Sequence, residues 1–300
     1  MIWVAGQIVR DDALSVSVLD RTFEHGLGLF ETFRTWNGHA TLLPRHLERL
    51  NGAAADLGLP VPEAWQLPTE KDVHDLLKAD GRVGDAMLRI TMSGGVAGSP
   101  TGAMVWMRSF HLPPEKAEGY VITATWKVAA RDRYGSSSQD LRRYKTLNYW
   151  ERRRVHELAL NDGLDENLAI DENGAIYEGS RTNVFVITGD HVSTPHGDGR
   201  IVPGIMRNLV LQLATEAGLT CSEVNSPLVF DRFSFGSADE VFLTNSVRGI
   251  LPVAGFRHDY GTEWEYTPDW TKRFPAPGPR TVRLWHTVRS WLESGGEHPQ

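Results

Sequence analysis

The chain has 300 residues, of which 41% are hydrophobic and 23% are charged, a composition that is typical of a globular protein and not of a disordered or membrane-embedded one. This length allows a large core and two domains. The formal net charge of −7 argues against a nucleic-acid partner, because phosphate binding relies on clustered Lys and Arg. The single cysteine, Cys221, cannot form an intrachain disulfide, no apolar run is long enough for a membrane span, and the start lacks the pattern of a signal peptide. We therefore expect a cytoplasmic protein with no membrane partner.

The segment from residue 14 to residue 34 begins with an alternation of period two over residues 14–19, which predicts a strand. Gly26 and Gly28 then have the spacing that opens a dinucleotide-binding loop, but Glu31 stands where the third glycine belongs and no clear strand–helix–strand unit follows. We therefore reject a dinucleotide site. His25 is either a loop histidine bonded to the backbone or part of a substrate pocket.

Two helices are predicted next. Pro44 opens the first, which ends before Gly58 and has an apolar stripe made of Leu47, Leu50, Ala54 and Leu57. Arg49 lies off this stripe, where a long basic side chain is usually solvated. The second helix is predicted to begin at Thr69, because Asp72 stands three residues on in a capping-box arrangement.

Residues 86–92 and 103–110 predict two strands. Alternation in the first strand puts Arg89 on the face opposite Leu88 and Ile90. Because the apolar pair should face the helices, we expect Arg89 to point to the other side of the sheet.

A domain boundary is predicted after these strands, because residues 112–119 combine a proline pair with charged residues. We place an N-terminal α/β domain at residues 1–113, a linker at 114–119 and a C-terminal cofactor-binding domain at 120–300.

Lys145 follows residues 131–143, a segment rich in serine and charge that is typical of a loop able to close over a site. It stands at the start of a helical pattern that ends at Gly163 and whose apolar positions are Leu147, Trp150, Val155 and Leu158. We therefore expect Lys145 to lie close to the core.

Glu178 ends a predicted strand at residues 175–177, which is reached through a hairpin with the turn signal Asn173-Gly174. Lys145 and Glu178 thus both come from ordered elements, and a cofactor could lie between them.

A helix is predicted to start after Pro203-Gly204, with Ile205, Leu209 and Leu213 in phase. Its first N–H groups lack intrahelical partners and carry the positive end of the helix dipole, so a phosphate is a natural occupant, although water can cap any helix start.

Four motifs follow one another in the chain: Lys145-x-x-Asn-Tyr149, Glu178-Gly-Ser-x-x-Asn-Val-Phe, Pro203-Gly-Ile-x-Arg and Thr-Asn-Ser246. In their order and spacing, the chain from about Gly6 to Arg283 resembles the class IV (fold type IV) pyridoxal-phosphate enzymes. That family contains branched-chain and D-amino-acid aminotransferases and 4-amino-4-deoxychorismate lyase. The resemblance implies a mixed α/β (α+β) fold with a smaller N-terminal α/β domain and a larger, barrel-like C-terminal mixed α/β domain, and it implies a homodimer.

The resemblance also implies the cofactor, pyridoxal 5'-phosphate, and its ligands, with no metal. Lys145 would form a Schiff base with the cofactor aldehyde and later carry a proton between the substrate α-carbon and the cofactor. Glu178 would keep the pyridine nitrogen protonated. The other implied ligands are Arg49, Ile205, Met206 and Ser246 for the phosphate and Tyr149 for the ring oxygen.

The substrate pocket that the resemblance implies consists of His25, Phe30, Thr32, Arg89, Val247 and Arg248. Thr32 and Arg248 make it more polar than the pocket of branched-chain aminotransferases and favour the lyase, which gives 4-aminobenzoate and pyruvate, whereas Tyr149 favours a transaminase. Three hypotheses stand: a transaminase that moves an amino group between a small amino acid and a 2-oxo acid, the lyase, and a catalytically inactive binding protein. We favour the transaminase.

Overall fold

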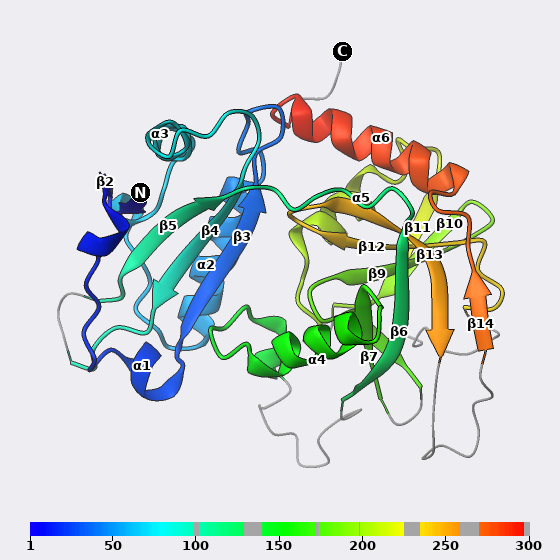
Figure 1. Cartoon of the computed structure of the whole chain (residues 1–300), viewed down its shortest axis with the longest axis horizontal. Coiled ribbons are helices and arrows are strands. Elements are labelled where there is room, and N and C mark those ends of the chain that lie inside the picture. The colour runs from blue at the N-terminus through cyan, green and yellow to red at the C-terminus, as the bar shows by residue number, and fades with distance from the viewer. Residues whose placement is uncertain are drawn as a thin grey trace. The chain divides into compact units, whose positions relative to one another are not determined.

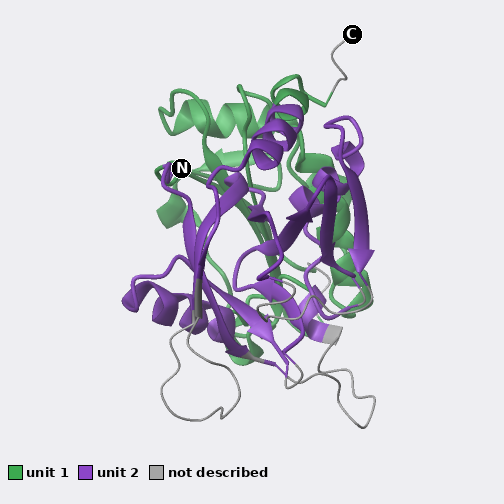
Figure 2. Cartoon of the chain, turned by 90° about the vertical axis from the view of Figure 1, so that its right-hand side faces the viewer, with its two compact units in different colours: residues 1–114, 144–149, 290–300 green, residues 115–143, 150–289 purple. Residues whose placement is uncertain are grey.

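The computed structural model describes residues 1–98, 102–128, 140–171, 174–197, 199–224, 235–258 and 270–296. It divides into two compact units (Figure 2). Unit 1 consists of Met1–Pro114, Tyr144–Tyr149 and Ser290–Gln300, and unit 2 of Glu115–Arg143 and Trp150–Arg289. We propose that these units are the two domains of the protein, with a boundary inside the predicted linker.

Unit 1 is built on a five-stranded antiparallel sheet with the order β2-β1-β5-β4-β3. Its strands are β1 (Ile2–Val4), β2 (Gln7–Val9), β3 (Gly28–Arg34), β4 (Met87–Ser93) and β5 (Val105–Phe110). Its helices are α1 (Arg21–His25), α2 (Leu43–Asp56) and α3 (Glu70–Ala79), with the short 3-10 turns η1 (Asp11–Ala13) and η2 (Ala64–Gln66). The strand predicted at residues 14–19 is not formed, and Val18 and Leu19 are exposed.

The two helices predicted from caps and periodicity are confirmed. In α2, Leu50 and Ala54 of the predicted stripe are buried. In α3, the Thr69 side chain accepts a hydrogen bond from the Asp72 N–H while the Asp72 carboxylate accepts one from the Thr69 N–H, which is the predicted capping box.

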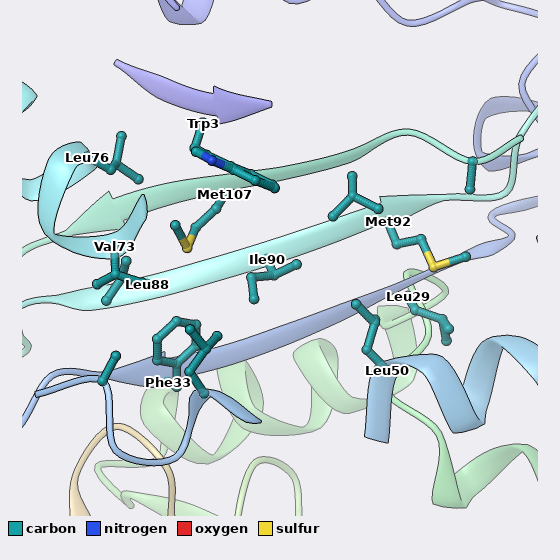
Figure 3. Close-up of a cluster of buried hydrophobic side chains, with 14 of the residues drawn as sticks. Trp3, Leu29, Phe33, Leu50, Val73, Leu76, Leu88, Ile90, Met92 and Met107 are labelled. Carbon is teal, nitrogen blue, oxygen red and sulfur yellow. The ribbon is translucent and has the colours of Figure 1, made fainter. Parts of the chain in front are cut away.

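The hydrophobic core of unit 1 is centred on one face of this sheet (Figure 3). Leu88 and Ile90 of β4 are fully buried in it, as predicted, together with apolar side chains of the helices and the neighbouring strands. The other members labelled in the figure are Trp3, Leu29, Phe33, Leu50, Val73, Leu76, Met92 and Met107. Because side chains alternate along a strand, this core fixes which residues of β3 and β4 point to the opposite face.

The segment Tyr144–Tyr149 belongs to unit 1 because it pairs with β3. The Phe30 N–H donates to the Lys145 carbonyl over 2.9 Å, and the Leu147 N–H donates to the Gly28 carbonyl over 2.9 Å. Lys145 therefore lies in an extended segment. The prediction that it stands at the start of a helix is wrong, because these strand-like hydrogen bonds replace helical ones.

The helix itself, α4 (Trp150–Asn161), begins five residues after Lys145. The predicted apolar face is also wrong in part, since Trp150 is 73% exposed and Leu158 is 47% exposed. Val155 packs against buried side chains, and Ala159 is buried. The spacing of apolar residues thus located the helix but did not give its orientation.

Unit 2 contains a nine-stranded mixed sheet with the order β11-β10-β9-β12-β13-β6-β7-β8, in which β14 pairs with β13 (Figure 1). The strands are β6 (Tyr120–Lys127), β7 (Glu166–Ile170), β8 (Ile176–Gly179), β9 (Asn183–Thr188), β10 (His191–Pro195), β11 (Thr220–Val224), β12 (Glu240–Asn245), β13 (Gly249–His258) and β14 (Trp270–Arg273). The last strand of the order, β8, also contacts β9 and β10, so the sheet curls as the predicted barrel-like domain requires.

The remaining helical elements are α4, α5 (Ile205–Leu213), α6 (Pro279–Glu293) and the 3-10 turn η3 (Asp140–Arg143). The sheet in each unit is accompanied by helices, which confirms the predicted mixed α/β class. Two predictions fall on residues outside the described ranges: most of the loop at residues 131–143, and Asn173 of the predicted hairpin turn. Among the helices that the structure describes, none is both long enough and apolar enough to cross a membrane.

Candidate active site

Glu31 and Arg49 form a buried ion pair in unit 1. The pleat of β3 places Glu31 between Leu29 and Phe33 on the face that α2 covers. Its carboxylate accepts a hydrogen bond from Arg49 Nε over 2.8 Å at Oε1 and one from Arg49 Nη2 over 2.6 Å at Oε2. His46, one helical turn before Arg49, lies 2.7 Å from Glu31 Oε2 through Nδ1. One carboxylate thus orients two side chains of the same helix.

The charges of this cluster follow from its burial. Burial alone would raise the pKa of Glu31, but Arg49 and His46 together lower it to about 2, so Glu31 is ionised. Burial lowers the pKa of His46, although the hydrogen bond and the charge of Glu31 act to raise it. We therefore assign a neutral ring that donates from Nδ1. Glu31 thus takes the Nε–Nη2 edge of the Arg49 guanidinium as a bidentate partner.

Phe30 is the centre of a second cluster on the opposite face of the same sheet. Lys145 Nζ lies 4.7 Å from the centroid of the Phe30 ring, and Arg89 Cζ lies 4.0 Å from it. The Tyr149 ring meets the Phe30 ring edge to face at 5.1 Å, and Lys145 Nζ is 6.0 Å from the Tyr149 ring. The structure therefore brings together four of the predicted site residues within unit 1.

Arg89 and Thr32 are direct cross-strand partners in the β3–β4 pair. Arg89 lies opposite to the face of Leu88 and Ile90, as alternation predicts. Burial lowers the pKa of Arg89, while the nearby Tyr149 opposes the shift. Among the residues that the structure describes, no carboxylate pairs with Arg89, and a guanidinium that has lost water in this way is suited to binding an anionic group.

His25 ends α1 and its side chain is exposed to solvent. Its role in a substrate pocket stays a prediction.

Glu178 is buried in unit 2, within β8 and not at the end of a strand as predicted. Its Oε1 accepts from Arg152 Nη2 of α4, and its Oε2 accepts from the Val202 N–H over 3.0 Å. Burial raises the pKa of Glu178, and Arg152 is the main group that opposes this rise. Glu178 is therefore a carboxylate whose charge depends on its neighbours.

The start of α5 is linked to Glu178 through the same residue, Val202. Its carbonyl accepts a hydrogen bond from Asn183 Nδ2 over 3.1 Å. Gly204 is the N-cap of α5, so the first N–H groups of the helix donate no hydrogen bond to an N-cap side chain. A Cβ at Gly204 would lie 1.9 Å from Asn183 Oδ1, so a larger residue here requires the Asn183 side chain or the start of α5 to shift.

Ile205 and Met206 follow Gly204 as the first residues of α5 and are both buried. Their backbone N–H groups lie at the positive end of the helix dipole, where an anion is favoured.

Ser246, Val247 and Arg248 form the turn between β12 and β13. Asn245 Oδ1 accepts hydrogen bonds from the Val247 N–H over 3.0 Å and the Arg248 N–H over 2.8 Å. The N–H of Val247, a predicted pocket residue, therefore already has a partner inside the protein. The Arg248 guanidinium lies 5.9 Å from the centroid of the Tyr120 ring.

Sequence reasoning missed the roles of Glu31, His46 and Arg152. A signal for the first was available, because Glu31 is the one charged residue among the apolar positions Leu29 to Phe33 of a buried strand. For Arg152 no such signal existed, because no local pattern in the sequence indicates its contact with Glu178.

The comparisons with known proteins agree on one family. A family model described as Amino-transferase class IV matches residues 28–256. The chain is 28% identical over 268 residues to the aminodeoxychorismate lyase of Bacillus subtilis, covering 88% of this chain and 89% of that protein. It is 28% identical over 273 residues to the branched-chain-amino-acid aminotransferase of Escherichia coli, covering 84% of this chain and 83% of that protein.

Solved structures have the same fold. The branched-chain aminotransferase of the archaeon Thermoproteus uzoniensis, solved with norvaline, matches with a TM-score of 0.80 at 24% sequence identity, covering 99% of this chain and 95% of that chain. This likeness confirms the predicted fold type IV architecture. The family match spans well over half of the chain, and the enzymes of this family use pyridoxal 5'-phosphate. The chain therefore belongs to the class IV aminotransferases, enzymes that use pyridoxal 5'-phosphate to move an amino group between an amino acid and a 2-oxo acid.

Proposed function

We propose that Lys145 is the lysine that carries the cofactor, and that the enzyme transfers the amino group of a small amino acid to a 2-oxo acid. The observation that carries this proposal is the position of the Lys145 amine against the Phe30 ring, with Tyr149 on the same ring. Hydrogen bonds to β3 fix the backbone that bears this amine. An amine held in this way is suited to act as nucleophile and as proton carrier.

The chemistry of the donor groups fits pyridoxal phosphate. A phosphate needs cationic and N–H donors: in unit 1 Arg49 is such a cation, and in unit 2 the start of α5 offers N–H groups. A pyridinium needs a buried carboxylate, which Glu178 supplies. Within unit 2, Val202 connects Glu178 with the start of α5. Its N–H donates to Glu178, and it stands two residues before Gly204, the N-cap of that helix. We propose Ser246 as a further phosphate ligand.

Each residue then has a task that its geometry allows. When bound, the cofactor supplies an aldehyde carbon and an electron-withdrawing ring that stabilises negative charge at the substrate α-carbon. Lys145 takes the α-proton and returns it. Glu178, as a carboxylate, holds a proton at the pyridine nitrogen. Tyr149 donates to the ring oxygen, and Arg49, oriented by Glu31, binds the phosphate.

We assign the pocket wall to Phe30, Thr32, Arg89 and Arg248, with His25 and Val247 as further candidates. Arg89 is the best supported of these, because its guanidinium lies over the Phe30 ring, as the Lys145 amine does, and because burial removes part of its hydration. A carboxylate on the substrate would restore the solvation that burial removes. An acidic amino acid such as glutamate is therefore our expected amino donor.

The second candidate activity is that of an aminodeoxychorismate lyase. The similarity to the lyase of Bacillus subtilis and the polar residues Thr32 and Arg248 favour it. Both reactions begin with removal of the α-proton, so the cofactor ligands do not distinguish them, and specificity must come from the pocket wall.

A single-turnover experiment distinguishes the two. The enzyme in its aldehyde cofactor form is mixed with excess glutamate, and the absorption spectrum and released products are followed. A transaminase converts the cofactor to its amine form and releases 2-oxoglutarate. If no L- or D-amino acid produces the amine form while aminodeoxychorismate yields 4-aminobenzoate and pyruvate, the transaminase assignment is wrong and the lyase stands.

We further propose that the enzyme is a homodimer. Unit 1 exposes apolar side chains beside α1, where Val18, Leu19 and Phe23 are 77%, 60% and 65% exposed. Such a patch is unusual on a monomer and fits a self-association surface.

We also propose a cytoplasmic location on the basis of cysteine usage, since the single Cys221 leaves no intrachain disulfide.

A further inference from the structure

Arg152 and Glu178 form a buried ion pair in unit 2, in which the side chains are 12% and 4% exposed. Arg152 comes from the first turn of α4 and Glu178 from β8. The same guanidinium donates to two backbone carbonyls, that of Arg142 over 3.2 Å and that of Ser180 over 3.4 Å. These bonds fix the guanidinium in one place.

Trp126 of β6 provides the surface on which this guanidinium rests. Arg152 Cζ lies 5.3 Å from the centroid of the Trp126 ring, and Arg142 Cζ lies 5.1 Å from it. Trp126 is itself held by α4, because its Nε1–H donates to Glu151 Oε1 over 2.9 Å. A planar guanidinium on an indole face keeps its N–H groups available at the edge, where Glu178 accepts one.

The charge of Glu178 depends on this arrangement. Burial favours the neutral acid, and the groups that favour the carboxylate are the guanidinium of Arg152, the Val202 N–H and the more distant guanidinium of Arg142. Of these, Arg152 has the largest effect. The other ionisable groups near this strand have their own partners: Tyr177 bonds to Asp171, and Glu166 is bonded by Ser180.

Only the carboxylate can hold a proton on a pyridine nitrogen as an ion pair; a neutral carboxyl group cannot. Its two oxygens must also point in a fixed direction, and here Arg152 takes Oε1 while the Val202 N–H takes Oε2. A carboxylate oxygen has a second lone pair, so each can accept one more hydrogen bond.

We propose that Arg152 is a positioning residue of the active site, which holds Glu178 ionised and in one orientation toward the pyridine nitrogen of the cofactor, and that Trp126 holds Arg152. This inference rests on the proposed role of Glu178. It adds a residue that touches neither the cofactor nor the substrate and acts through the carboxylate that does.

The test begins with the cofactor-free protein. The carboxyl titration of Glu178 is followed by infrared or 13C NMR spectroscopy, and its signal is identified as the one that Glu178→Gln removes. In Arg152→Gln the titration midpoint moves to higher pH, whereas Arg152→Lys, which keeps a cation, moves it less. Trp126→Leu, which removes the surface under the guanidinium, shifts the midpoint in the same direction.

The matched control is Arg153→Gln. Arg153 is the next residue of α4 and pairs with Glu157 at the surface, 2.7 Å from Nε to Oε1, so this variant also removes one arginine and one ion pair. It leaves the Glu178 midpoint unchanged. An Arg152→Gln midpoint equal to that of Arg153→Gln overturns the proposal. If Arg152→Gln does not fold, the Glu178 midpoints of Arg152→Lys and Trp126→Leu are compared with that of Arg153→Gln. Midpoints equal to that of the control overturn the proposal.

A second measurement uses the enzyme with cofactor. In Arg152→Gln, the rate of α-proton removal from glutamate falls about tenfold or more at pH values below the shifted midpoint and recovers as the pH rises through it, because Glu178 then ionises without help. Glu178→Gln is slow at every pH. A Glu178→Gln rate equal to that of the parent overturns the proposed role of Glu178 at the cofactor, while the cofactor-free titration still decides whether Arg152 controls its charge.

Discussion

The Glu31 carboxylate binds the guanidinium of Arg49 in a bidentate pair, with distances of 2.8 Å to Nε and 2.6 Å to Nη2. Glu31 comes from the centre of β3 and Arg49 from α2, so the pair joins the sheet to the helix that covers it. The pair fixes the plane of the guanidinium before any ligand binds. We infer that Arg49 is oriented in advance for the cofactor phosphate.

Replacing Glu31 with Gln should therefore weaken cofactor binding without removing any group that we assign to the cofactor. We expect the affinity for pyridoxal phosphate to fall about tenfold or more, since a hydrogen bond to a charged group is worth about 1.5–3 kcal/mol. Titration of the cofactor-free protein by absorbance measures this. Glu48→Gln, an exposed position next to Arg49 on α2, is the control and should bind normally. Equal affinity in Glu31→Gln and Glu48→Gln would refute the role of Glu31.

The same pair predicts a pH dependence of stability. The pKa of Glu31 is about 2 in the folded protein, below the ordinary value of 4.5. A depressed pKa means that this carboxylate stabilises the fold at pH values above about 4.5, by about 3 kcal/mol, and that the contribution is lost as the pH falls toward about 2. The difference in free energy of unfolding between the parent and Glu31→Gln should therefore shrink over that range. A difference that stays constant from pH 6 to pH 3, measured by urea unfolding, contradicts the assignment.

How much the sequence could predict depended on the range of the interactions. Local signals gave α2 and α3 correctly: Pro44 and Gly58 limit the first, and the Thr69 cap starts the second. Alternation along β4 likewise gave the side of the sheet on which Arg89 lies. These features are set by residues a few positions apart, so they can be read from one segment.

Long-range pairing was not predictable in the same way. The helical pattern around Lys145 was misread because the segment bonds to β3, more than a hundred positions earlier in the chain. Trp150 was expected to face the core but is exposed, because the apolar side chains through which α4 packs inward include Val155 and Ala159. Arg152 and Glu178 are 26 positions apart, and only the fold brings them together.

Gly204 provides a test of the phosphate site in unit 2. In Gly204→Ala the new methyl group would lie 1.9 Å from Asn183 Oδ1, so either the Asn183 side chain or the start of α5 must shift. We expect a loss of about 1–3 kcal/mol in the free energy of unfolding, typical of overpacking, and a weaker affinity for pyridoxal phosphate. The control is Gly197→Ala, where the nearest atom is 3.9 Å from the added Cβ.

A second variant separates the clash from other effects. Asn183→Ala removes the oxygen that the methyl group meets, so the double variant Asn183→Ala/Gly204→Ala should recover part of the affinity that Gly204→Ala loses. If Gly204→Ala binds the cofactor as tightly as Gly197→Ala, the start of α5 is not a phosphate site.

The exposed apolar side chains beside α1 predict the effect of polar substitutions on assembly. Leu19→Ser together with Phe23→Ser should convert the dimer to a monomer in sedimentation velocity, because the substitutions remove apolar area from the association surface. Val83→Ser is the control, since Val83 is 99% exposed elsewhere in unit 1. A parent protein that is monomeric and fully active at nanomolar concentration would refute the homodimer.

The central claim is that Lys145 holds the cofactor, and reduction with borohydride tests it most directly. The purified protein is incubated with pyridoxal phosphate, reduced and digested, and the modified residue is located by mass spectrometry. We predict a yellow protein that, after reduction, carries one pyridoxyl phosphate group on Lys145, and no such adduct in Lys145→Ala. An adduct on another lysine of the parent, or none, would contradict the assignment of the active site.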